Sequence, residues 1–126
     1  MKTMTCHILL IEDEPDLRET LRDLLELFGF RVETAANGQE GLHKLESVGN
    51  PCLILLDLMM PVMNGWQFLE TLRKDPQPGR ASIPVLVVSA ALDMLDIQAQ
   101  YGCRSLSKPV DIDKLLDMAH AHCESC

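Results

Sequence analysis

Three things are scarce in this sequence: long apolar runs, basic residues and regularly spaced cysteines. A membrane-spanning helix needs about 18 consecutive apolar residues, and no run in the chain approaches that length. The early apolar stretch at 8–11 is also too short for the core of a signal peptide. Lys and Arg number 11 against 19 Asp and Glu, and the net charge of −8 opposes binding to a nucleic-acid backbone. These absences predict a soluble, cytoplasmic protein with no membrane contact and no direct nucleic-acid partner.

The cysteines form no disulfide framework. They stand at positions 6, 52, 103, 123 and 126, an odd number at irregular spacing, which indicates reduced thiols. A chain of this length buries about 65% of its unfolded surface and needs no covalent staple. Repeats, low-complexity segments and internal linkers are also missing. We therefore expect one domain over residues 1–126, with a core at about 7–119 and a solvated tail at 120–126, whose His and Cys residues offer a zinc site only as the weaker alternative.

Short apolar runs alternate with helical patterns along the chain. The runs lie at 7–11, 31–35, 52–56 and 85–88, with a shorter fifth at 104–107. Three are apolar nearly throughout, as strands covered on both faces are. Apolar residues at helical spacing predict helices at 15–28, 38–47, from 64 onward, 92–101 and 112–119. Five strand–helix units with right-handed crossovers predict an α/β fold, a doubly wound, flavodoxin-like (βα)5 domain whose five-stranded parallel sheet has the order 2-1-3-4-5.

Polar residues follow four of the five predicted strands. They are Glu12-Asp13-Glu14 after the first, Asp57 after the third, Ser89 after the fourth and Lys108 after the fifth. Because the carboxyl ends of parallel strands share one edge of the sheet, we expect these groups to converge. Neighbouring carboxylates repel each other, and a shared proton or a hard divalent cation relieves that repulsion.

Magnesium suits a site with few carboxylates and several bound waters. Such an ion beside a lysine can hold a phosphoryl group, and a carboxylate can be the nucleophile that forms an aspartyl phosphate. Taken singly, each group has a plainer interpretation: the acids at 12–14 as a helix cap, Asp57 as a turn residue, Ser89 as a cap and Lys108 as a surface charge. The four together, each at a strand end, favour a phosphoryl-transfer site.

The same residues resemble the receiver domains of two-component response regulators. The resemblance covers about residues 7–119 and depends on four segments: the acidic pair Glu12-Asp13, the segment 57–65 with the phosphoacceptor pattern D-x-x-M-P-x-M-x-G, Ser89-Ala90 and Lys108-Pro109. The pattern at 57–65 is the most specific of the four.

The resemblance implies a metal site and a phosphoacceptor. Asp57 is expected to accept the phosphoryl group. Asp13, Asp57 and the backbone carbonyl of Met59 are expected to bind Mg²⁺ directly, and Glu12 is expected to act through a bound water.

It also implies how the phosphoryl group is held. Lys108 and Ser89 are expected to contact phosphoryl oxygens, as the switch residues of the family do. The Lys108–Pro109 bond is expected to be cis, an isomer found in about 5% of X-Pro bonds. Pro61 and Gly65 are expected to shape the loop that leads into the third helix.

The implied phosphoryl donor is a histidine kinase or a histidine phosphotransfer protein. Since only seven residues follow Ala119, we expect output to pass through another, unidentified protein. The resulting interpretation is a stand-alone receiver, monomeric or dimeric, that is not an enzyme beyond catalysing its own phosphorylation and slow dephosphorylation. Three alternatives stay open: a receiver-like interaction module that acts independently of phosphorylation, a phosphatase that turns over external substrates, and a fragment of a hybrid kinase or of a longer regulator.

Two other interpretations fit the residues poorly. A flavodoxin-type flavin site needs a loop of free backbone donors after the first strand, whereas here that loop is acidic. A haloacid-dehalogenase-type phosphatase needs a second acid two residues after the nucleophile, and Met59 occupies that place.

Several positions depart from the commonest family pattern. The first acid is Glu12 rather than aspartate, and Ser105 stands where an aromatic residue usually lies three positions before the lysine. The fourth helix is expected to be short, displaced or partly unwound, because Ser89 and Lys108 are closer in sequence than is usual. Met59 and Ala91 cannot orient an attacking water, so we predict slow self-dephosphorylation.

Overall fold

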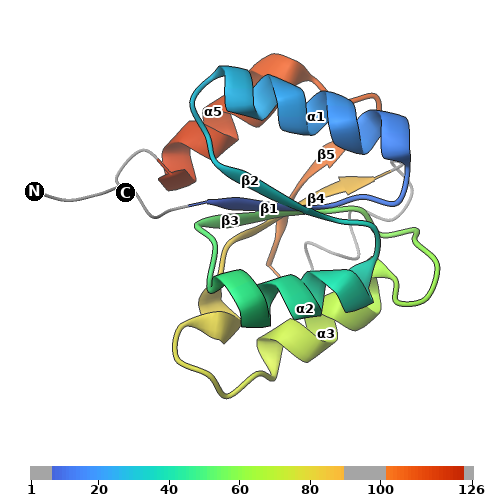
Figure 1. The fold of residues 1–126 in the computed structure, drawn as a ribbon, viewed down its shortest axis with the longest axis vertical. Helices are drawn as coiled ribbons and strands as arrows, with labels where there is room; N and C mark the ends of the chain where they lie inside the picture. The colour runs from blue at the N-terminus through green and yellow to red at the C-terminus, as the bar shows by residue number, and fades with distance from the viewer. Residues whose placement is uncertain (1–6, 90–101, 124–126) are drawn as a thin grey trace, which may run out of the picture.

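Five parallel strands form the central layer of the protein. The computed structural model describes residues 7–89 and 102–123. The strands are β1 (Ile8–Ile11), β2 (Val32–Ala35), β3 (Leu53–Leu56), β4 (Val85–Ser89) and β5 (Arg104–Ser107). They pair in the order β2-β1-β3-β4-β5, which confirms the predicted topology (Figure 1).

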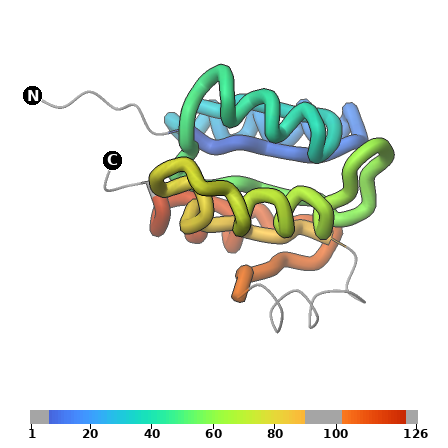
Figure 2. Tube along the Cα trace, turned by 90° about the horizontal axis from the view of Figure 1, so that it is seen from below, coloured from blue at the N-terminus to red at the C-terminus, as the bar shows by residue number. Residues whose placement is uncertain are grey.

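Helices cover both faces of this sheet. One face carries α1 (Pro15–Leu27) and α5 (Ile112–Cys123), and the other carries α2 (Gly38–Val48) and α3 (Gly65–Arg73), with the 3-10 turn η1 (Arg80–Ser82) following α3. Figure 1 shows the two helical layers with the sheet between them, and Figure 2 shows the same arrangement turned by 90°. The fourth helix predicted at 92–101 lies outside the described residues.

The sheet separates two apolar cores, and alternate residues of β1 face opposite cores, as the pleat requires. Ile8 and Leu10 pack with α1 and α5, whereas Leu9 and Ile11 pack with α2 and α3. All four residues of β1 are buried. A continuous apolar run of this kind is typical of a parallel strand that has helices on both sides.

Local capping signals fix where the helices begin. Pro15 occupies the first turn of α1, where its missing N–H costs nothing. The side chain of Asn37 accepts a hydrogen bond from the Glu40 N–H at the start of α2. Asn64 and Gln67 form a reciprocal capping box at the start of α3. Two of these helices, α1 and α2, start shortly after β1 and β2, whereas α3 follows the longer loop at 57–64.

A buried arginine joins the C-terminal ends of α2 and α3. The Arg80 guanidinium, 6% exposed, donates to the side chains of Asn50 at 2.7 Å, Glu46 at 3.0 Å and Asp75 at 3.4 Å. It also donates to the Leu45 carbonyl at 3.5 Å. This network ties the segment after α3 to the end of α2, far from the carboxyl edge of the sheet.

The C-terminal helix is longer than the sequence predicts. We expected it to end near residue 119 and the chain to continue as a solvated tail, but α5 runs to Cys123. The His120 ring lies 5.0 Å from the Phe30 ring, centroid to centroid, and this contact holds the additional turn against the loop before β2. The predicted end of this helix near residue 119 is therefore wrong.

One expectation about the thiols is also wrong. Cys52 is disulfide-bonded, although its irregular sequence spacing indicated a reduced thiol. Its N–H donates to the His7 carbonyl at 2.9 Å, so it lies directly beside the segment that enters β1. The spatial neighbours of this cysteine, which spacing along the chain does not reveal, determine its pairing.

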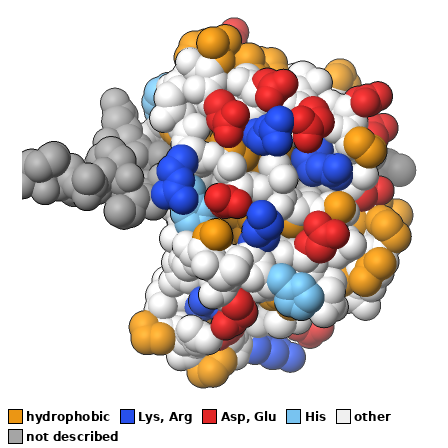
Figure 3. Space-filling model, in the orientation of Figure 1, with side chains coloured by type: hydrophobic (Ala, Val, Ile, Leu, Met, Phe, Trp, Pro, Cys, Tyr) orange, Lys and Arg blue, Asp and Glu red, His pale blue; other side chains and the backbone are white. Residues whose placement is uncertain are grey.

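The surface carries charges of both signs. Acidic and basic side chains are interspersed on the face drawn in Figure 3. Several form surface ion pairs, such as Lys44 with Glu33 at 3.1 Å, and pairs of this kind contribute about 0–1 kcal/mol. Among the described residues, no helix is long and apolar enough to span a bilayer.

Candidate functional site

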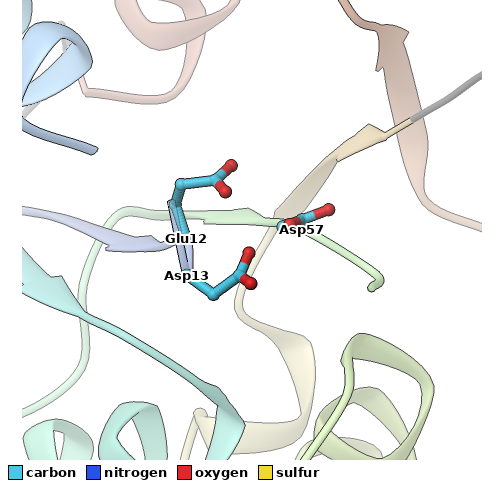
Figure 4. A group of neighbouring side chains, drawn as sticks. All are labelled: Glu12, Asp13 and Asp57. Carbon is cyan, nitrogen blue, oxygen red and sulfur yellow. The ribbon is translucent and has the colours of Figure 1, made fainter. Parts of the chain in front are cut away.

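Three carboxyl groups meet at the carboxyl ends of the two central strands. β1 pairs with β3 so that Ile11 lies opposite Leu56, which places Glu12 and Asp57, the next residue on each strand, side by side. Glu12 is 2% exposed and Asp57 4% exposed. With the half-buried Asp13, they bring one carboxylate oxygen each within 4.8 Å of one another. Figure 4 shows the three side chains directed into the same space.

A lysine from the edge strand reaches two of these carboxylates. Lys108 Nζ lies 3.2 Å from Glu12 Oε1 and 3.5 Å from Asp57 Oδ2. The peptide bond between Lys108 and Pro109 is cis, as the resemblance implied. The Lys108 N–H donates to the Ser89 carbonyl at 2.9 Å, so β4 and β5 stay paired up to this point.

The predicted site residues line one open cavity of about 300 Å³. Its described lining residues are Glu12, Asp13, Glu14, Asp57, Met59, Ser89 and Lys108. Ser89 is buried at the end of β4, and Met59 is exposed. The structure thus brings together every residue that the sequence placed in the site, at one edge of the sheet. Ala91, the other residue expected to affect dephosphorylation, lies outside the described residues.

Burial makes the two inner acids harder to ionise. It raises the pKa of Glu12 from 4.5 to about 7, although the Glu14 N–H, which donates to Glu12 Oε2 at 3.1 Å, acts in the opposite direction. The nearby Asp57 charge raises this pKa further, and Lys108 lowers it. Burial also raises the pKa of Asp57, against the opposing effects of Lys108 and the Met59 N–H.

The same environment favours the charged form of Lys108. Burial lowers the pKa of Lys108, but the carboxylates of Glu12 and Asp57 outweigh that effect and raise it above its ordinary value. Lys108 therefore stays charged at neutral pH. Among the described residues lining the cavity it is the one cation facing four acids.

This imbalance of charge fits a divalent cation. Oxygen ligands from Asp13 and Asp57, with an acid at Glu12 close by, are the donors that Mg²⁺ prefers. Burial raises the pKa values of Glu12 and Asp57, and a bound metal ion would favour the ionised forms of both carboxyl groups. The residues present therefore fit the ion that the sequence predicted.

A tight loop leads from Asp57 into α3. A Cβ at Gly65 would lie 2.6 Å from the Asp57 carbonyl oxygen and 2.7 Å from Leu58 Cα, so only glycine permits this close approach. The Gly65 N–H donates to the Leu58 carbonyl at 2.9 Å. These contacts explain how Gly65 shapes the loop that leads into α3.

The same loop contains a turn that the sequence does not predict. The Met63 N–H donates to the Pro61 carbonyl at 2.7 Å and closes a three-residue turn around Val62. Val62 has a φ of 68°, in the left-handed region that β-branched residues avoid. The Met63 carbonyl in turn accepts from the Gly38 N–H at 2.9 Å, which anchors the loop to the start of α2.

Sequence reasoning missed Arg18 and gave no part to the backbone of Glu14, and both position Glu12. Arg18 donates through Nη1 to the Glu12 carbonyl at 2.9 Å, and the Glu14 N–H binds the Glu12 carboxylate. Arg18 lies on the first turn of α1, four residues after Glu14, and its N–H bonds to the Glu14 carbonyl. An arginine one turn into the helix that follows an acidic strand end was the available signal.

The fold and the site together define a class of protein: a doubly wound α/β domain with a buried aspartate, a lysine and a serine around one acidic cavity. The family model described as the response regulator receiver domain matches residues 8–120. The chain belongs to this family, whose members are the receivers of two-component systems.

The relatives are longer proteins. Response regulator Rre1 from Synechocystis sp. is 42% identical over 112 residues, which cover 86% of this chain and 47% of that protein. The CpxR homolog of Haemophilus influenzae, a transcriptional regulatory protein, is 43% identical over 89 residues, 71% of this chain and 36% of that protein. The chain therefore spans half or less of the length of these relatives.

Solved receiver structures match nearly the whole chain. The N-terminal domain of a response regulator receiver protein from Methanoculleus marisnigri is 32% identical, with a TM-score of 0.73 and coverage of 91% of this chain and 94% of that chain. Response regulator TrrA from Thermotoga maritima, crystallised in complex with Mg²⁺–BeF, is 27% identical, with a TM-score of 0.78 and coverage of 92% and 97%.

Proposed function

We propose that residues 7–119 form a single receiver domain that accepts a phosphoryl group on Asp57 in the presence of Mg²⁺. The proposed donor is the phosphohistidine of a kinase or phosphotransfer protein in the cytoplasm. The observation that carries the proposal is the position of Lys108, whose Nζ lies within 3.5 Å of both the Asp57 and the Glu12 carboxylates. A phosphoryl group attached to Asp57 would enter directly into reach of this cation.

Each residue has a distinct part in the proposed transfer. A carboxylate oxygen of Asp57 attacks phosphorus, the P–N bond of the phosphohistidine breaks, and the imidazole nitrogen keeps the electron pair and takes up a proton. Lys108 and the Ser89 hydroxyl, both lining the cavity, donate hydrogen bonds to phosphoryl oxygens.

The metal site uses the remaining groups. Asp13, Asp57 and the Met59 carbonyl would hold Mg²⁺ directly, and Glu12 would hold one of its waters. When bound, the ion neutralises negative charge on the phosphoryl oxygens and on the nearby carboxylates. Arg18 and the Glu14 N–H keep Glu12 oriented towards the cavity through the hydrogen bonds described above.

Small-molecule phosphodonors test the proposal. With acetyl phosphate and Mg²⁺ we expect the intact protein to gain the mass of one phosphoryl group, sensitive to hydroxylamine as an acyl phosphate is. The gain should disappear in Asp57→Asn and remain in Asp16→Asn, a matched exposed carboxyl group at the start of α1. An unmodified wild-type protein, or modification retained in Asp57→Asn, would disprove the assignment.

One observation favours a second candidate function, an interaction module that acts without phosphorylation. Ser105 occupies the place in β5 where the family usually has an aromatic residue, so the usual aromatic output device is absent from β5. Partner binding that is equal for the wild type and Asp57→Asn, before and after acetyl phosphate treatment, would support this alternative. Release of many phosphate equivalents per chain would instead indicate a phosphatase.

A further inference from the structure

A second cavity lies at the edge of the sheet opposite Asp57. It has a volume of about 230 Å³, and none of its described lining residues also lines the cavity around Asp57. It is bounded by the starts of β4 and β5 and by the ends of α3 and α5, which both run back to this edge of the sheet (Figure 1). Along β5, Arg104 in this cavity is about 13 Å from Lys108 in the other.

Apart from a cysteine, the ionisable side chains that line this cavity are all basic. Arg73 comes from the last turn of α3, Arg104 from the start of β5 and His122 from the last turn of α5. No Asp or Glu is among the described lining residues, although the whole chain carries a net charge of −8. The cavity is therefore a local basic region on an acidic protein, and we call it the basic cavity.

The Arg73 guanidinium is held in place by neutral acceptors. Its Nη1 donates to the carbonyls of Ala81 at 3.0 Å and Ile83 at 3.1 Å, and its Nη2 donates to Cys103 Sγ at 3.7 Å. Burial raises the pKa of the Cys103 thiol and outweighs the opposing effect of Arg73, so the sulfur stays protonated at neutral pH. Neither Arg73 nor Arg104 forms an ion pair with a described acid. The charge of Arg73 is thus oriented without being neutralised by one.

Arg104 supplies the charge that the backbone compensates least. Arg73 and His122 lie at the C-terminal ends of helices, where the partial negative charge of the last carbonyls offsets part of a positive charge. Arg104 lies on a strand, and its side chain is exposed. An anion in the basic cavity meets two guanidinium groups, whose planar donors match the geometry of a carboxylate. The imidazole of His122 adds a hydrogen-bond donor even when it is neutral.

The remaining walls of the basic cavity are largely apolar. They are formed by residues 83–86, which lead into β4, and by Met118 of α5. Ligand pockets combine walls of this kind with a few polar groups that fix the orientation of the ligand. The volume lies below the range of about 300–1,000 Å³ that suits drug-sized ligands, so the ligand that fits is small.

We propose that the basic cavity is a binding site for a small organic acid. The carboxylate group would bind Arg73 and Arg104, and the apolar body would pack on Met118 and residues 83–86. An inorganic anion would leave these apolar walls in contact with water, and a neutral molecule would leave both guanidinium groups without a counter-charge. The inference goes beyond phosphorylation and does not depend on it, because the two cavities share no described lining residue.

Titration of the isotope-labelled protein with benzoate, phenylacetate and isovalerate, followed by NMR, tests the proposal. We expect saturable shifts of the backbone amides of Leu86, Cys103 and Arg104, with a dissociation constant of about 1 mM for the best of the three acids. Benzamide, the neutral counterpart of benzoate, and inorganic phosphate should bind at least roughly tenfold more weakly. The proposal is overturned if none of the acids shifts these amides, or if benzamide or phosphate binds as tightly as the best acid.

Substitution of Arg104 shows whether the charge of the cavity is responsible. Arg104→Gln should weaken binding of the best acid roughly tenfold, because one charge-assisted hydrogen-bonding partner is lost. The matched control is Arg31→Gln, an equally exposed arginine that precedes β2 at the other margin of the sheet, and it should bind as the wild type does. Asp57→Asn should also retain binding. Equal losses in Arg104→Gln and Arg31→Gln would contradict the assignment and would leave the proposed phosphorylation of Asp57 unaffected.

Discussion

Lys108 Nζ lies 3.2 Å from Glu12 Oε1, and this contact joins the edge strand β5 to the end of the central strand β1. Glu12 is almost fully buried in this pair. The single positive charge of Lys108 does not neutralise the cavity, because Asp57 and Asp13 also line it. The metal-free site therefore has an excess of negative charge. The first two predictions follow from that excess.

The metal-free protein should lose stability as the pH rises from about 4.5 to 7. The pKa of Glu12 is 4.5 ordinarily and about 7 in the fold, so the folded state binds more protons than the unfolded state across this window. The raised pKa of Asp57 acts in the same direction. Urea denaturation in the presence of a chelator measures the effect. Glu12→Gln should flatten the dependence and Glu70→Gln should not; an unchanged slope in Glu12→Gln would contradict the prediction.

Magnesium should stabilise the protein, and more strongly above about pH 7 than below it, because protons and the metal ion compete for the same carboxylates. The measurement is the shift in Tm on adding Mg²⁺. We expect Asp13→Asn and Asp57→Asn to abolish most of the shift, and the exposed Asp16→Asn to retain it. A full shift in both site variants would place the binding elsewhere.

Self-dephosphorylation should be slow, because the Met59 side chain lines the cavity without a group that can orient water. Met59→Asn introduces an amide at that position. One additional hydrogen bond to the attacking water is worth about 1 kcal/mol, so loss of the phosphoryl group should accelerate roughly fivefold. The decay of acetyl phosphate-labelled protein after donor removal measures this. A wild-type lifetime of seconds that Met59→Asn leaves unchanged would refute the explanation.

Arg80 should matter for stability but not for phosphorylation. Its guanidinium is buried and bonded to Asn50, Glu46 and Asp75, so Arg80→Ala removes several hydrogen bonds at once. We expect a loss of about 2–4 kcal/mol in the free energy of unfolding. Lys74→Ala, which removes an exposed ion pair, should cost under about 1 kcal/mol. Comparable losses in the two variants would show that the buried network contributes little.

Much of the fold and the site could be predicted from sequence because strands and strand ends are local signals. The short runs predicted as strands match the observed strands to within about one residue, and a polar residue at the end of β1, β3, β4 and β5 reaches the cavity. Parallel pairing then brings Asp57 and Glu12 together with no further information about side chains.

The features that escaped prediction depend on contacts between distant segments. The extra turn of α5 is held by the contact between the rings of His120 and Phe30. Arg80 binds Asn50, which lies thirty residues earlier in the chain. Arg18 reaches back to the backbone carbonyl of Glu12, a contact that depends on the path of the chain between β1 and α1. Val62 adopts a positive φ that valine disfavours. It does so because the residues on either side of it are fixed by their own contacts.

The side chains around the cavity come from strands that differ in the number of their hydrogen-bonded neighbours. Glu12 and Asp57 extend from β1 and β3, each of which has a hydrogen-bonded neighbour on both sides. Lys108 follows β5, which is paired only with β4, and the Lys108 N–H is bonded to Ser89. Adjustment to a new anion on Asp57 is therefore easiest at the outermost strand. Phosphorylation of Asp57 would therefore alter the outer surface of the molecule first at β5, the edge strand, and not at the centre of the sheet.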